Sequence, residues 1–107
     1  MEDKFIELHK NDFGNVNFCH HCGCAMVAFG NLIFKVNEDD FILFIKLINQ
    51  LNIKYQSKPD QHPEEKIMIQ MDIPDFFIAL QKNELSKLAS LLNQADLMRS
   101  VHQLIYK

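Results

Sequence analysis

The front half of the chain alternates apolar and polar residues as β-strands do. Leu32, Phe34 and Val36 share one face of a strand, and an apolar run over residues 24–29 precedes it. Gly30-Asn31 lies between the two and is typical of a tight hairpin turn. Residues 4–8 and 16–18 flank a segment rich in Asn, Asp and Gly and predict another hairpin. This half is therefore predicted to form an antiparallel sheet of hairpins.

Two longer stretches repeat apolar residues with helical spacing. The first runs from residue 38 to about residue 51, behind Asn37 as a cap and three acidic residues that suit a helix N-terminus. The apolar residues of this helix extend over more than one face. Either the sheet and a second helix cover all of them, or an exposed part of the apolar surface serves self-association. The second helix is expected over residues 84–106. Residues 52–55 are expected as a strand and residues 56–65 as a polar loop.

A weak internal repeat links the two halves. Shifting the chain by 44 positions lays residues 41–50 over residues 85–94, and residues 32–36 over residues 76–80. The match favours a second hairpin, although a helix that begins at Pro74 stays open. We predict an α+β fold over a single domain, residues 1–107: an antiparallel β-sheet of hairpins with two main helices packed on one face, and a duplicated ββα unit as a candidate.

Composition narrows the classes of function. The 107 residues are 48% apolar and 23% charged, which suits one globular domain that folds without a metal. Eleven basic against fourteen acidic residues give a net charge of −3, which argues against nucleic-acid binding. No apolar run is long enough to predict a membrane helix. The acidic start lacks the apolar stretch of a secretory signal, so a cytoplasmic location is expected.

One segment, residues 18–24, has the spacing of metal ligands. Cys19 and Cys22 are two residues apart, and Gly23 permits a positive φ just behind the second sulfur. The segment resembles one knuckle of a zinc ribbon, which implies zinc as the candidate cofactor. No second Cys-x-x-Cys follows, so two more ligands are needed. They would come from a second chain or from Cys24, His20, His21, His9, His62 or His102.

The order of elements carries a second resemblance. A Cys-x-x-Cys, a strand, the Phe29-Gly30 turn, another strand and a helix that opens on Asp40-Phe41 are similar to a small family of uncharacterised bacterial proteins. The likeness covers about a third of the chain and implies an architecture without an activity. It does not extend to His20, His21 and Cys24.

Other interpretations of the cysteines stay open. Cys24 suits a buried core position, and Cys19 with Cys22 suits a turn that holds no ion. A redox pair would need a helix N-terminus, and no helix is predicted there. His62 and His102 are expected at the surface. The sequence contains no known catalytic motif, so we expect a small non-enzymatic interaction module. A zinc knuckle, a homodimer and a protein partner are the candidate properties of this module. The alternative is a thiol-based redox or metal-sensing protein.

Overall fold

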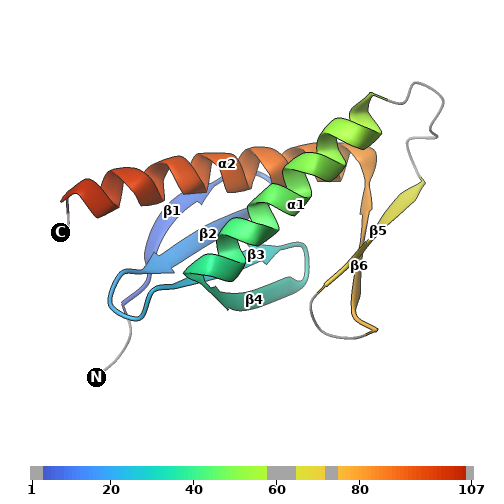
Figure 1. The fold of residues 1–107 in the computed structure, drawn as a ribbon. Coiled ribbons are helices and arrows are strands. Elements are labelled where there is room, and N and C mark those ends of the chain that lie inside the picture. The colour runs from blue at the N-terminus through green and yellow to red at the C-terminus, as the bar shows by residue number, and fades with distance from the viewer. Residues whose placement is uncertain (1–3, 58–64, 72–74, 106–107) are drawn as a thin grey trace.

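The computed structural model describes residues 4–57, 65–71 and 75–105 and has an α+β fold, as predicted. Both helices lie on the same face of a four-stranded antiparallel sheet, and a separate two-stranded hairpin stands at one end (Figure 1). The elements in chain order are β1 (Ile6–Lys10), β2 (Gly14–Cys19), β3 (Cys24–Phe29), β4 (Leu32–Asn37), α1 (Glu38–Gln56), β5 (Lys66–Gln70), β6 (Phe77–Gln81) and α2 (Lys82–Ile105).

Two glycines permit the close pairing of strands in the main sheet. Gly30 has a φ of +57° in the turn between β3 and β4, which confirms the predicted hairpin there. Gly14 opens β2 opposite Phe29, where a Cβ would overlap the backbone carbonyl of Ala28. The pairing of β2 with β3 then runs without a break to Cys19 opposite Cys24. This register fixes the position of the cysteine segment at the far end of the hairpin.

Helix α1 begins as the sequence predicts and ends later. The side chain of Asn37 accepts a hydrogen bond from the backbone N–H of Asp40 at 2.8 Å, and Glu38, Asp39 and Asp40 fill the first turn. The strand expected over residues 52–55 is wrong, because the helix continues to Gln56. Its apolar spacing also continues, and Leu51 and Tyr55 pack against the core.

The repeat predicted from the sequence corresponds to two hairpin-plus-helix units. Residues 77–81 form strand β6, so a helix over this stretch is wrong; Pro74 itself lies outside the described residues. Helix α2 follows β6 directly, as α1 follows β4, and the two helix starts are 44 residues apart. The equivalent residues Asn49 and Asn93 exchange two hydrogen bonds of 2.9 Å between α1 and α2. Such reciprocal contact is expected where two copies of a unit pack around an approximate two-fold axis.

The core lies between the sheet and the helix layer. Helix α2 covers β1 and β2, whereas α1 packs on β3, β4 and α2. The sheet and α2 therefore cover the wide apolar surface of α1 from two sides, which is the first of the two arrangements expected from the sequence. Leu43 remains 60% exposed. The largest fully buried side chains come from the sheet and both helices: Phe18, Phe41, Ile48, Leu85, Leu88, Leu91 and Leu92. In the described part of the chain, no helix is long and apolar enough to cross a membrane.

Candidate functional site

The cysteine segment is a tight turn between β2 and β3. Residues 20–23 leave the sheet after Cys19 and return at Cys24, and no helix begins there. The backbone N–H of Gly23 donates to the carbonyl of Cys19 at 2.8 Å, and Gly23 has a φ of +72°. The positive φ predicted for Gly23 is thus confirmed, and it turns the chain back toward β3.

Backbone N–H groups surround the sulfur of Cys19. Cys19 is fully buried, and its Sγ accepts a hydrogen bond from the N–H of Cys22 at 3.3 Å. This bond is the main reason that the pKa of the Cys19 thiol lies below its ordinary value; the Cys22 side chain and the N–H groups of His21 and Lys4 act in the same direction, and burial opposes them. The turn therefore stabilises a thiolate at Cys19.

The other two sulfurs differ from Cys19 in exposure. Cys22 is exposed at the outer side of the turn, and its side chain hydrogen-bonds Cys19. Cys24 is half-buried, and its Sγ lies 3.8 Å from the carbonyl oxygen of Cys22. Cys24 is therefore not a core residue, although its neighbour Ala25 is fully buried. The structure brings Cys19 and Cys22 together as a pair and directs Cys24 toward the backbone of the turn.

The two histidines of the turn point in different directions. His20 packs edge-on against Phe18, with ring centroids 4.9 Å apart, on the side of the sheet that the helices cover. Its ring also lies 5.8 Å from that of His102 in α2. His21 is exposed. His20 thus contacts Phe18 and His102, and the described residues do not group it with the sulfurs as metal ligands.

Charged groups surround His20 and His102 at the ends of both helices. Arg99 is buried and donates to Glu38 at 2.5 Å and to Asp96 at 2.8 Å, and Gln103 also donates to Glu38 at 2.6 Å. Burial lowers the pKa of His20 below its ordinary value; the charges of His102 and Arg99 add to this effect and Glu38 opposes it. These contacts tie the start of α1 to the end of α2 next to the turn.

The remaining histidines stand apart from the sulfurs or cannot be placed. His102 was expected at the surface, but it is half-buried against His20. His9 is half-buried in β1, and His62 lies outside the described residues. Within residues 4–57, 65–71 and 75–105, no group of three or more His, Cys, Asp or Glu side chains is arranged to hold a metal ion. The described residues thus supply a pair of thiols rather than a full set of ligands.

Gly23 gives a direct test of the backbone of the turn. Gly23→Ala is expected to cost about 1–2 kcal/mol of unfolding free energy, since an L-residue pays this much for left-handed backbone. Nothing lies within 4 Å of the position of the new Cβ, so a steric clash does not contribute. Gly23→Asn should cost less, because Asn tolerates positive φ better. Urea unfolding of both variants measures this, and an equal loss in the two would contradict the assignment.

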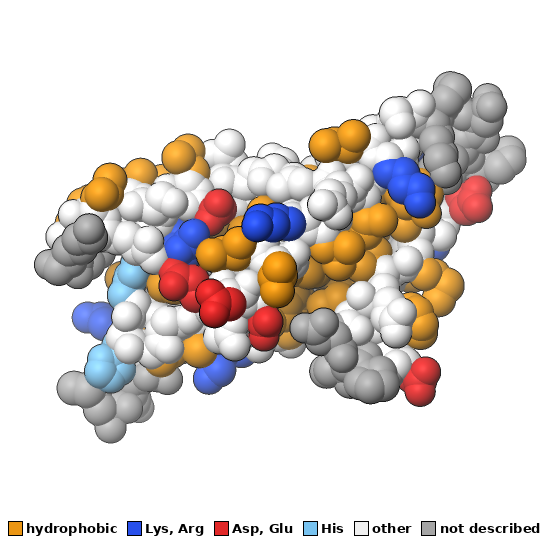
Figure 2. All heavy atoms as spheres, in the orientation of Figure 1, with side chains coloured by type: hydrophobic (Ala, Val, Ile, Leu, Met, Phe, Trp, Pro, Cys, Tyr) orange, Lys and Arg blue, Asp and Glu red, His pale blue; other side chains and the backbone are white. Residues whose placement is uncertain are grey.

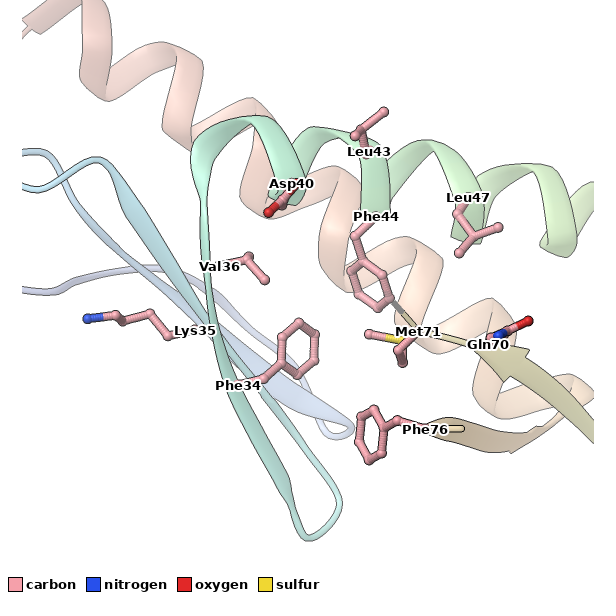
Figure 3. Close-up of a pocket in the computed structure, with 10 residues that line it drawn as sticks. All are labelled: Phe34, Lys35, Val36, Asp40, Leu43, Phe44, Leu47, Gln70, Met71 and Phe76. Carbon is pink, nitrogen blue, oxygen red and sulfur yellow. The ribbon is translucent and has the colours of Figure 1, made fainter. Parts of the chain in front are cut away.

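A second feature is an apolar hollow of about 220 Å³ under α1, between β4 and the β5–β6 hairpin. Phe34 of β4 and Phe44 of α1 point into it, as do Met71 and Phe76 beside the ends of β5 and β6, whereas Lys35 points away (Figure 3). Apolar side chains also gather between α1 and this hairpin on the surface (Figure 2). The described lining is mostly apolar, with Lys35 and Asp40 as its charged residues, so the hollow offers mainly shape and apolar contact.

Comparison with known proteins places the chain in a family. The model of a family of unknown function, DUF6686, matches residues 1–106. The chain belongs to this family. No curated protein and no solved structure matches it significantly. DUF6686 membership agrees with the predicted likeness to uncharacterised proteins and extends it over almost the whole chain, but it carries no activity.

Proposed function

We propose that this chain is a small, non-enzymatic interaction module in which Cys19 and Cys22 form a zinc-binding knuckle. One observation carries the proposal: the backbone N–H of Cys22 donates to the sulfur of Cys19, directly beside the Cys22 thiol, and this hydrogen bond lowers the pKa of Cys19. Zinc binds cysteine only in the thiolate form, so a turn that stabilises the thiolate lowers the cost of giving up the proton. The proposal includes a reducing, cytoplasmic setting in which the thiols persist.

A thiol-based redox or metal-sensing protein is the second candidate. The pKa of the Cys19 thiol, which lies below its ordinary value, and the exposed Cys22 thiol beside it favour this second candidate. Two features support the knuckle instead. In a redox pair the thiol with the low pKa should meet its substrate, but here that thiol is fully buried, and the exposed residue is Cys22. The turn also lacks a helix N-terminus, which lowers the thiol pKa in Cys-x-x-Cys redox proteins.

Zinc titration of reduced, chelator-treated protein against a chromophoric competitor tests the proposal. Cys19→Ser and Cys22→Ser should each weaken zinc binding by at least about a hundredfold, since even residues that only support a ligand contribute 10–100-fold. Cys24→Ser is the matched control, because the described residues do not group its side chain with Cys19 and Cys22 as a set of metal ligands, and it should bind zinc like the unaltered chain.

Two results separate the candidates. A chain that binds no zinc at micromolar concentration would exclude the knuckle. If, in addition, treatment with a hydroperoxide joined Cys19 and Cys22 in a disulfide with loss of two hydrogens, the redox alternative would replace it. A chain that binds zinc and loses it in both serine variants supports the module proposed above.

A further inference from the structure

The Cys19–Cys22 pair fills only half of the coordination shell of a structural zinc. Such an ion takes four ligands in tetrahedral geometry. The described residues arrange no third His, Cys, Asp or Glu side chain with this pair. His20 lies on the helix side of the sheet against Phe18, and Cys24 is directed to the carbonyl of Cys22. The missing ligands would therefore come from outside the residues that the structure describes.

The turn is placed where a second molecule can reach it. It projects from the end of the four-stranded sheet, opposite to the end where the β5–β6 hairpin stands (Figure 1). His21 and Cys22 are both exposed there. Cys19 is buried, and its sulfur hydrogen-bonds the side chain of Cys22, so the exposed Cys22 is the sulfur that a second chain would meet first. An ion that replaces the proton between these two sulfurs would lie next to Cys22, at the surface.

We propose that one zinc ion is held between two copies of this chain, with Cys19 and Cys22 of each copy as its four ligands. The inference rests on the proposed zinc knuckle and names its partner. Two identical turns related by a two-fold axis supply four sulfurs in pairs, and a two-fold dimer is the commonest assembly of identical chains. Four thiolates and one zinc ion leave two negative charges. The N–H groups that point at each Cys19 sulfur offset them.

The arrangement makes dimerisation dependent on the metal. The knuckle of one chain alone binds zinc through two sulfurs, whereas the pair of chains completes the shell. Zinc would then control whether two copies associate, and chelation would separate them. Stability of each chain does not need the ion, because Phe18, Phe41 and Leu88 are buried between the sheet and the helices, and this burial does not depend on a metal.

Native mass spectrometry of the reduced full chain, with and without added zinc, tests this. We expect a single chain after chelation, and two chains with one zinc ion once zinc is added. Cys22→Ser should lose both the ion and the dimer, and Cys24→Ser should keep both. Cobalt in place of zinc should show the charge-transfer absorption of four thiolate ligands.

Three outcomes would overturn the inference in distinguishable ways. One zinc ion bound to a single chain would remove the shared site and leave the proposed knuckle intact. A dimer that persists after chelation and in Cys22→Ser would show that the turn is not the interface. Absence of zinc binding altogether would remove the inference together with the zinc knuckle on which it rests.

Discussion

Phe41→Ala is expected to remove about 3–5 kcal/mol from the free energy of unfolding, the cost of deleting a buried aromatic ring and leaving a cavity. Phe41 has no exposed surface and lies in the first turn of α1, where the helix meets the sheet. Stability of ordinary domains is only about 5–15 kcal/mol, so the variant should be close to unfolding at room temperature.

Leu43→Ala is the matched control for this substitution. Leu43 lies two residues further along the same helix and is 60% exposed. Its loss removes little buried surface, so a change of about 0.5 kcal/mol or less is expected. Urea unfolding followed by circular dichroism compares the two variants. Equal losses would contradict the assignment of the buried side of α1.

Arg99→Met is expected to cost about 2 kcal/mol, through the loss of hydrogen bonds to two carboxylates. The Arg99 side chain is 10% exposed and contacts both Glu38 and Asp96. Removal of one partner of a fully buried ion pair costs about 3–5 kcal/mol, but Glu38 and Asp96 are 38% and 40% exposed, so water solvates them in the variant and reduces the loss.

The ion pair of Lys87 with Asp12 provides the comparison for Arg99. The Lys87 Nζ lies 3.4 Å from the Asp12 Oδ2, and the side chains of Lys87 and Asp12 are 47% and 77% exposed. Lys87→Met should change stability by about 0.5 kcal/mol or less. A double-mutant cycle of Arg99→Met with Glu38→Gln isolates the interaction energy between Arg99 and Glu38. A coupling energy no larger than that of Lys87 with Asp12 would show that the buried arginine does not join the two helices.

The hairpins and helices were readable from the sequence because local periodicity determines them. Gly30-Asn31 correctly marks the turn between β3 and β4. Asn37 correctly marks the start of α1. The end of α1 is predicted too early, with a strand over residues 52–55, whereas the apolar stripe of the helix continues through Leu51 and Tyr55. In that stretch, tertiary packing outweighed the local polar residues.

For the candidate site, the sequence predicts which residue types take part but not how their side chains are arranged. The spacing of Cys19 and Cys22 with Gly23 indicated a turn that brings two sulfurs together, and the structure has that turn. The position of His20 could not be predicted in this way, because β2 ends at Cys19 and the ring of His20 lies against that of His102, far along the chain. The contact of Arg99 with Glu38 joins residues 61 positions apart, and no local pattern signals such a contact.

Amide NMR spectra of isotope-labelled, metal-free protein during addition of zinc test the central claim most directly. We predict that the resonances of His21 and Cys22, whose N–H groups point at the Cys19 sulfur, shift most, and that the change is complete at half an equivalent of zinc per chain. Resonances of α1 should stay in place. Zinc-induced shifts centred on His20 and His102, or none in the turn, would contradict the claim that Cys19 and Cys22 form the metal-binding knuckle of this chain.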